Sequence, residues 1–250
     1  PAYNARLRVW RGDEAGARQQ VDEVLAQNAG HPGGLKMKAA WDIQADKVDD
    51  AVLGLRAVLD QAPQDAEAMS LMASAYDRAG EADLARDYLS QAAAASGNAP
   101  TETLRLATRL MSEERWRPAE DAILPALRLE PGNLNLLTAL GQVYLSMPDL
   151  PRAQGVIARL REIGTPEALA AAEQMDLNRL ANEQGQDAAL GYLEQQANAE
   201  NASIGSKLSL IRAQLATGQT EAALRLRMPV SVCGEMAGNP KLVPLLLGLG

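Results

Sequence analysis

The chain has 250 residues, of which 47% are hydrophobic but only 3% are aromatic, and it contains no phenylalanine. This composition suits an alanine-rich stack of helices that needs no large central core. The formal net charge of −8 comes from 24 basic and 32 acidic residues. Because so acidic a chain offers no basic stripe to displace phosphate counterions, nucleic acid is not the expected partner.

A single cysteine excludes an internal disulfide framework and leaves the redox compartment open. No run of residues is as long and apolar as a membrane span requires, and no basic-then-apolar signal segment opens the chain. The sequence starts at Pro1, which falls inside a repeat described below, so we expect a fragment whose missing N-terminus held any targeting signal. A location in the bacterial cytoplasm or in the cell envelope stays open.

The main organising feature of the sequence is a ladder of alanines that recur every 34 positions. That period is the length of one helix-turn-helix unit in a stacked helical array. A small side chain at such a position lets neighbouring helices approach closely. The sequence therefore predicts about seven units, the first of them truncated, with a two-residue slip before the sixth alanine: Ala17, Ala51, Ala85, Ala119, Ala153, Ala189 and Ala223.

At the N-terminus, residues 1–11 read as the end of a helix, and Gly12 with Asp13 forms a turn. Residues 28–34 are rich in glycine and hold His31, the only histidine. A phosphate-binding loop would need a preceding strand and a lysine followed by Ser or Thr after the glycines, and both are missing. We therefore predict a plain loop between repeats over residues 28–34.

The unit that opens at Ala66 shows the helical register in full. Its first helix carries apolar residues at spacings of three and four, Gly80 makes the turn, and its second helix presents a stripe of small and apolar residues. The same register returns one period later, and again after that. The residues that define it in the first of these units are Met69, Met72, Ala73, Tyr76, Ala85, Leu89 and Ala92.

Three prolines fall within predicted helices. Pro118 and Pro151 fall in the first turn of second helices, where a missing N–H is harmless, whereas Pro125 falls in mid-helix and predicts a kink.

The acidic pairs Asp49-Asp50 and Glu113-Glu114 are adjacent in sequence, so we expect solvated surface rather than a carboxylate dyad. Trp41 and Trp116 are expected to be packing residues.

Over about residues 1–227 the pattern resembles the tetratricopeptide repeat (TPR). The resemblance rests on a small residue at the eighth place of the unit, an aromatic at the eleventh, alanines at the twentieth and often the twenty-seventh, and proline at the thirty-second. The resemblance implies an all-α, right-handed superhelical α-solenoid, with first and last repeats truncated. It implies a non-catalytic scaffold without cofactor or metal, which binds a protein or peptide on the concave face lined by first helices.

The register places small, polar and mildly apolar residues on that face. The constellation of Lys, Arg and Asn with which some family members clamp a terminal carboxylate is absent from these positions, so a C-terminal carboxylate ligand is disfavoured. The predicted peptide-binding residues are Ser70, Ser74, Asp77, Leu104, Thr108, Met111, Thr138 and Gln142.

The repeat register fails at Arg227 and Pro229, and residues 228–250 form a different segment. Its run Cys233-Gly234-Glu235-Met236-Ala237-Gly238, followed by Pro240 and Leu245 to Gly250, resembles the active-site cysteine segment of enzyme I of the phosphoenolpyruvate-dependent sugar phosphotransferase system. The resemblance implies that Cys233 corresponds to the proton donor to the enolpyruvate carbon. The family's phosphoacceptor histidine, metal-binding carboxylates and barrel have no counterpart upstream.

Two interpretations of the tail stay open: a junction of unrelated coding pieces, which is favoured, or an apolar cap on the solenoid. We therefore predict a scaffold whose binding does not depend on residues 228–250. The alternative is a fragment or fusion related to enzyme I and inactive in this chain.

Overall fold

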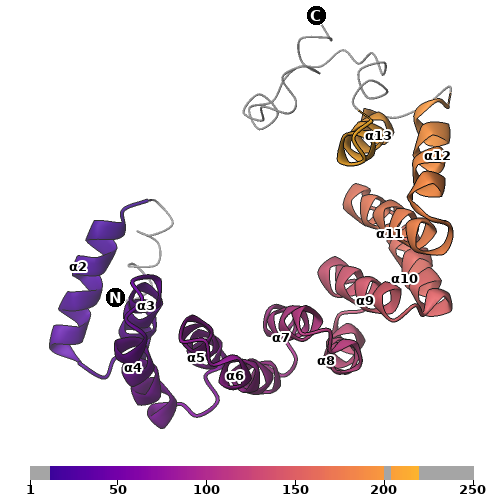
Figure 1. The fold of residues 1–250 in the computed structure, drawn as a ribbon. Helices are drawn as coiled ribbons and strands as arrows, with labels where there is room; N and C mark the ends of the chain where they lie inside the picture. Colours follow the sequence, from indigo (N-terminus) through magenta and orange to yellow (C-terminus); the bar gives the residue numbers. More distant parts are fainter. Residues whose placement is uncertain (1–11, 200–203, 220–250) are drawn as a thin grey trace, which may run out of the picture. The chain divides into compact units, whose positions relative to one another are not determined.

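The computed structural model describes residues 12–199 and 204–219, and this part of the chain is entirely helical. The chain divides into two compact units, Pro1–Ala171 and Ala172–Gly250. The predicted boundary at residue 227 and the tail that follows it lie outside the described residues. The helices (Figure 1) are α2 Glu14–Gln27, α3 Pro32–Gln44, α4 Val48–Gln61, α5 Ala66–Arg78, α6 Ala82–Ala95, α7 Pro100–Ser112, α8 Trp116–Leu129, α9 Leu134–Ser146, α10 Leu150–Ile163, α11 Pro166–Gln184, α12 Gln186–Ala197 and α13 Ile204–Ala216.

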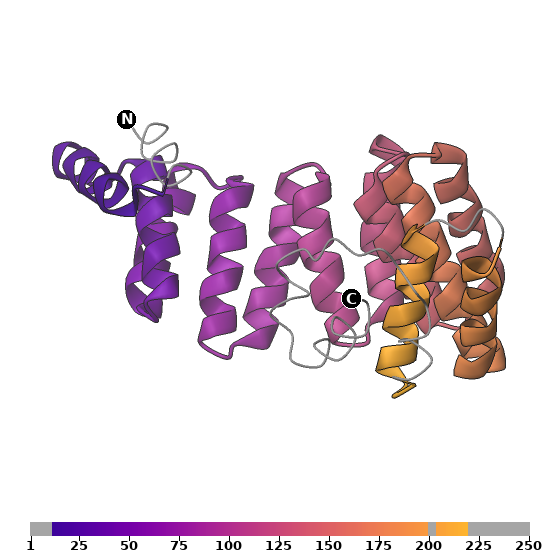
Figure 2. The ribbon, with the colours of Figure 1, turned by 90° about the horizontal axis from the view of Figure 1, so that it is seen from above.

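The first unit confirms the predicted period. The first helices α3, α5, α7 and α9 have 13 residues each, and the second helices α2, α4, α6, α8 and α10 have 14. Within each series, successive helices begin one full period of the alanine ladder apart. Figures 1 and 2 show the two series as neighbouring rows of antiparallel helices in this unit.

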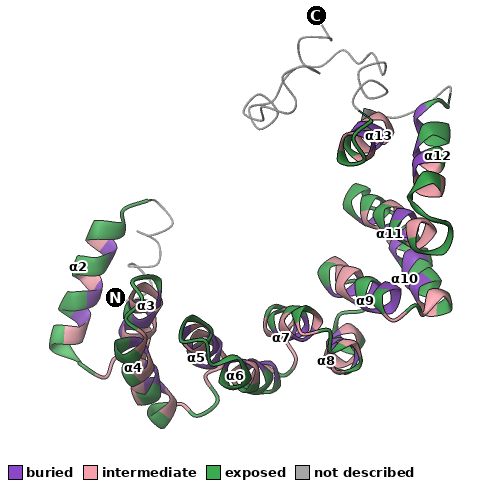
Figure 3. Ribbon diagram, viewed as in Figure 1, coloured by how far each residue is buried: buried purple, intermediate pink, exposed green. Residues whose placement is uncertain are grey.

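Packing between neighbours stabilises these helices, since a helix of three to four turns is marginal alone in water. In the best-filled layer, Leu55 and Val58 of α4 are fully buried together with Met72 of α5. The buried residues lie where each helix meets its neighbours (Figure 3). The alanine ladder forms the closest contacts, with Ala17, Ala51, Ala85, Ala119 and Ala153 each at most 1% exposed.

The turn between the two helices of each 34-residue repeat is also periodic. The same place in successive repeats is occupied by Gly12, Asp46, Gly80 and Glu114. All four have left-handed backbone, with φ of 78°, 58°, 78° and 56°. Glycine adopts this conformation without steric cost, whereas Asp46 and Glu114 carry a Cβ that opposes it. The alternation of glycine with acidic residues therefore leaves strain in some turns only.

The glycine-rich stretch at 28–34 is only partly the loop that was predicted. Helix α3 begins at Pro32, and the His31 side chain caps it, because His31 Nδ1 accepts a hydrogen bond from the Gly34 N–H at 3.1 Å. A Cβ on Gly34 would lie 3.0 Å from Leu25 Cδ2. Proline, glycine and histidine thus start a helix that packs tightly on α2, and the prediction of a loop over residues 32–34 is wrong.

Other sequence expectations in this unit have clear outcomes. Trp41 is a packing residue as predicted: it is half-buried, and the Arg18 guanidinium carbon lies 4.8 Å from its ring centroid. Helix α8 runs through Pro125 without interruption, since the ring removes only one hydrogen bond of the helix. The kink at Pro125 stays a prediction.

Helix α11 has 19 residues and begins in the first unit, and most of it belongs to the second unit. Helix α12 begins two positions later than the period from α10 requires, as the slip in the alanine ladder predicted. A leucine cluster formed by Leu177, Leu190, Leu193 and Leu210 stabilises this unit. Ala189 is only half-buried, and Ala223 lies outside the described residues. No helix in the described part of the chain combines the length and the apolar character that crossing a membrane requires.

We predict that Ala119→Leu or Ala153→Leu destabilises the protein by about 1–3 kcal/mol, because no space remains for a larger side chain at these helix contacts. Ala158→Leu is the matched control, since Ala158 is exposed on the same helix as Ala153. Urea unfolding followed by circular dichroism measures the difference. Equal stability of all three variants and the wild type would show that the ladder does not lie at close contacts.

We predict that Glu114→Gly raises the free energy of unfolding by about 0.5–1 kcal/mol, because glycine relieves the left-handed backbone of an exposed residue. Gly80→Ala, at the equivalent turn of the preceding unit, should lower it by about 1 kcal/mol. Thermal unfolding of both variants provides the comparison. A loss of stability in Glu114→Gly would contradict the turn geometry.

Candidate functional site

Two adjacent cavities open on the first-helix surface of the first unit, formed by α5, α7 and α9, which we call the groove face. The α5–α7 cavity has a volume of about 660 Å³. The α7–α9 cavity has a volume of about 440 Å³. Both share one wall on α7, made by Leu104, Thr108 and Ser112. The α5–α7 cavity is further lined by Ala73, Ser74, Asp77, Leu89, Arg105 and Arg109, and the α7–α9 cavity by Met111, Trp116, Asn135, Thr138, Ala139 and Gln142.

The structure brings together all but one of the residues that the register placed on this face. Ser74, Asp77, Leu104 and Thr108 line the α5–α7 cavity. Leu104 and Thr108 line the α7–α9 cavity as well, together with Met111, Thr138 and Gln142. Their part in binding stays a prediction.

Ser70 is the exception, since it is 4% exposed and lines neither cavity. Its hydroxyl has no hydrogen-bond partner in the part of the chain that the structure describes, while its carbonyl accepts a hydrogen bond from Ser74 Oγ at 3.1 Å. The register alone placed Ser70 with Leu104 and Thr138, but the closer packing of α5 covers the shorter side chain. A role of Ser70 in contacting a ligand is not supported by its burial.

Among the lining residues outside the predicted peptide-binding set, Trp116, Arg105 and Arg109 are the aromatic and charged ones. Trp116 was assigned to packing, but it is half-buried and forms part of the α7–α9 cavity. The sequence does contain a signal for a role of Trp116 outside packing, because this residue departs from the repeat pattern. The residues one period before and after it, Ala82 and Leu150, are not aromatic, so the helical stack does not require a tryptophan there.

Arg109 holds the carboxylates at the edge of the α5–α7 cavity. Its Nη1 donates to Asp77 Oδ1 at 2.7 Å, and its Nε donates to Glu113 Oε1 at 2.6 Å. Arg86 Nη1 donates to the second oxygen of Glu113 at 3.0 Å. These bonds join α5, α6 and the end of α7, and they leave Asp77 with its charge already balanced.

Glu113 is therefore not the solvated surface residue that was predicted, because its side chain is only 21% exposed and two arginines bind it. Burial opposes its ionisation, but the hydrogen bonds from Arg109 and Arg86 outweigh that effect and lower the pKa of Glu113. Its neighbour Glu114 is exposed as expected.

Arg105 contrasts with Arg109. It is exposed, lines the α5–α7 cavity, and forms no ion pair with any residue that the structure describes. The charged lining of this cavity thus consists of two arginines and one aspartate, a net charge of +1. Of these groups, only the Arg105 guanidinium is left to bind an anionic group of a ligand.

A second polar cluster, at Glu120, lies away from both cavities. Glu120 is 6% exposed and accepts hydrogen bonds from Tyr144 Oη at 3.1 Å and from Arg152 Nη1. The Arg152 guanidinium carbon also lies 4.7 Å from the Tyr144 ring centroid. Burial and the adjacent Glu120 carboxylate raise the pKa of Tyr144. Because every partner is satisfied and the cluster joins α8, α9 and α10, we assign it to packing of the solenoid.

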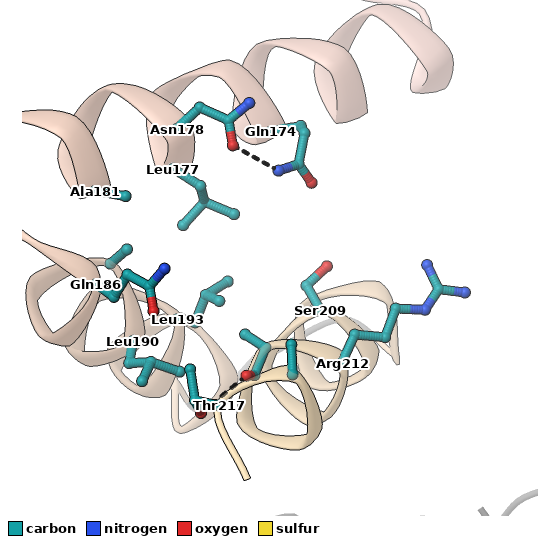
Figure 4. Close-up of a pocket in the computed structure, with 13 residues that line it drawn as sticks. Gln174, Leu177, Asn178, Ala181, Gln186, Leu190, Leu193, Ser209, Arg212 and Thr217 are labelled. Carbon is teal, nitrogen blue, oxygen red and sulfur yellow. Dashed lines mark hydrogen bonds between the residues drawn. The ribbon is translucent and has the colours of Figure 1, made fainter. Parts of the chain in front are cut away.

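The second unit contains a further cavity of about 400 Å³ between α11, α12 and α13 (Figure 4). Leu177, Leu190 and Leu193 provide its apolar surface. Side-chain amides line its rim, and Gln174 Nε2 donates to Asn178 Oδ1 at 3.1 Å. The lining also includes Arg212, an exposed cation, so this cavity combines an apolar base with neutral hydrogen-bonding groups and one positive charge.

The described residues contain no group of three or more His, Cys, Asp or Glu side chains that could hold a metal ion. Cys233, which the sequence relates to the enzyme I cysteine, lies outside the described residues. The chemistry that the cavities offer is therefore recognition by apolar contact, by neutral hydrogen bonds and by the guanidinium groups of Arg105 and Arg212.

No protein-family model and no curated protein matches this sequence. Solved structures do resemble it. A tetratricopeptide repeat protein from Parabacteroides merdae ATCC 43184 superposes with a TM-score of 0.62 at 11% identity, over 99% of this chain and 95% of that one. YrrB, described as a TPR protein with an unusual peptide-binding site, gives 0.51 at 15% identity over 82% and 97% of the two chains.

PilF of Pseudomonas aeruginosa likewise gives a TM-score of 0.51 at 19% identity, over 87% of this chain and 94% of that one. At such low identity these likenesses establish the fold and not the ligand. The chain is an α-solenoid with the fold of TPR proteins.

We predict that Glu113→Gln lowers the free energy of unfolding by roughly 1–2 kcal/mol at neutral pH, because two arginines lose their shared carboxylate. The folded-state pKa of Glu113 lies below its ordinary value of 4.5, so its contribution is present above that pH and is lost as the pH falls through the folded-state pKa. The difference between wild type and variant should therefore shrink below about pH 4. Glu114→Gln is the adjacent control, and a constant difference from pH 7 to pH 3 would contradict the prediction.

Proposed function

We propose that this TPR-like α-solenoid is a non-catalytic scaffold that binds an extended segment of a partner protein along the groove face. The observation that supports the proposal most is the pair of cavities that share the α7 wall formed by Leu104, Thr108 and Ser112. Cavities of several hundred Å³ with an apolar lining and a few polar groups are the usual form of a ligand site. Two of them in a row fit a ligand that extends across successive repeats.

The side chains on this face suit a peptide. Leu104, Met111 and Trp116 offer apolar surface for a side chain, and tryptophan loses little conformational entropy when it anchors a ligand. Asn135 and Gln142 each offer an amide that can donate to a carbonyl and accept from an N–H of an extended backbone. A flat helical surface without such cavities would not distinguish one segment from another.

The fold supports this proposal by analogy only. YrrB shares the fold and is described as having a peptide-binding site, and a shared fold raises the expectation of a shared mode of binding without fixing the ligand. The relation to enzyme I rests on the sequence around Cys233 alone. None of the structural likenesses bears on it, and we do not propose it as the function.

The test is selection from a random peptide library displayed on phage, with the immobilised full chain as bait. We predict that the wild type enriches peptides and that the double variant Leu104→Glu/Met111→Glu does not, because two carboxylates would occupy both cavities. The matched control is Leu53→Glu/Leu129→Glu, which changes two exposed leucines that line neither cavity.

A chain ending at residue 227 should enrich the same peptides as the full chain, since every lining residue of the groove face precedes that point. Circular dichroism of each variant shows that it is folded. Enrichment by the groove variant equal to that of the wild type would disprove binding on this face.

A further inference from the structure

We infer that the groove face selects segments in which an acidic side chain lies close in sequence to an apolar one, with the apolar side chain in the α7–α9 cavity and the acidic one at Arg105. This inference rests on the proposed function and specifies its ligand class. It is carried by the difference in chemistry between two cavities that share a wall.

None of the described residues that line the α7–α9 cavity is charged. Leu104, Met111 and Trp116 come from α7 and the start of α8 and give it apolar walls, while the polar groups opposite them on α9 are neutral. A charged ligand group placed here would lose its hydration without gaining a counter-ion. The cavity therefore favours an uncharged, apolar side chain.

The α5–α7 cavity has the opposite preference. Asp77 is the only carboxylate among the described residues of its lining, and Arg109 Nη1 lies 2.7 Å from Asp77 Oδ1. Arg105 is exposed and has no ion pair among the described residues, although the chain as a whole carries eight more acidic than basic residues. A carboxylate of the ligand is the group that complements this guanidinium, which can bind it with two parallel hydrogen bonds.

The architecture of the repeat does not explain Arg105. The residues one period before and after it are Leu71 and Ala139, neither of them charged. Arg109, in contrast, replaces Ala75 and Val143 of the neighbouring units but has three partners within the protein: Asp77, Glu113 and the Ala82 carbonyl oxygen. An arginine that the fold does not need, exposed in a cavity and unpaired, fits a role in recognition.

The shared wall determines the distance between the two recognised side chains. Leu104, Thr108 and Ser112 border both cavities, so a ligand that fills both must cross α7 between them. A short stretch of extended chain is enough for that crossing. The hydroxyls of Thr108 and Ser112 can donate hydrogen bonds to the ligand backbone or to the same carboxylate.

The experiment uses synthetic peptides of about ten residues in a Gly/Ser background, acetylated and amidated so that their termini carry no charge. Each contains one Leu and one Glu, separated by zero to three residues, and each has a partner peptide with Gln or Lys in place of Glu. Titration calorimetry with the full chain should show at least one spacing at which the Glu peptide binds about five-fold more tightly than the Gln peptide. The Lys peptide should bind more weakly still, and the preference should decline at high salt.

Variants at Arg105 test the assignment directly. Arg105→Gln should bind the Glu and Gln peptides equally, and Arg105→Glu should prefer the Lys peptide. A merely structural role of Arg105 would not produce this reversal. Arg159→Gln removes one positive charge from an exposed position on α10 that lines neither cavity, and it should keep the wild-type preference.

The outcomes separate this inference from the proposed function. If library selection depends on Leu104 and Met111 but the Glu and Gln peptides bind equally at every spacing, the groove binds peptides and the inferred ligand class is wrong. The same conclusion follows if none of these peptides binds while library selection succeeds. If the groove variant and the wild type enrich the same peptides, the proposed function fails and the inference fails with it.

Discussion

The close approach of helices at the alanine ladder is the contact on which the rest of the structure depends. Each helix of the first unit is too short to persist by itself, so it exists only because small residues let two neighbours bury its apolar stripe. The same contact sets the spacing of α5, α7 and α9 and therefore the size of the cavities between them. Stability and the geometry of the proposed groove thus have a common origin in alanines that line neither cavity.

The proposed recognition depends on positions that the repeat leaves free to vary. Residues that packing requires recur once in every period, as Ala85, Ala119 and Ala153 do, and they cannot vary without loss of stability. Arg105 and Trp116 have no such counterparts in the neighbouring units. The protein can therefore place a cation on α7 and an indole at the start of α8, each in one of two adjacent cavities, without disturbing the layers beneath, because each layer interacts only with its neighbours.

Much of the architecture could be predicted from the sequence, since a repeated unit presents the same packing signal several times over. The period of the ladder, the turn at Gly80 and the two-residue slip before α12 follow from spacing alone. Spacing also identified about half of the described residues that line the two cavities. The helix start at Pro32 was missed because glycine and proline usually mark loops, and the cap formed by His31 depends on a side-chain geometry that composition does not contain.

The errors at the site have one physical reason. Register assigns a residue to a face, but it does not say how deeply that face is covered, so Ser70 was placed in the groove although α5 packing buries it. Ion pairs between side chains of different repeats cannot be predicted from the register either. Glu113 meets Arg86 across 27 positions of sequence, and only the folded arrangement shows that these charges are already matched while Arg105 is not.

The shared wall on α7 also connects ligand binding in the two cavities to the cooperativity of unfolding. In an array that interacts only between neighbours, the units can open one at a time, each governed by its own interface terms. A ligand that contacts α5, α7 and α9 together would connect the two interfaces between these helices. Its binding free energy would then stabilise all three helices against unfolding, to an extent that depends on the ligand concentration. With a ligand bound in both cavities, the helices from α5 to α9 would unfold together, whereas the helices on either side would still unfold separately.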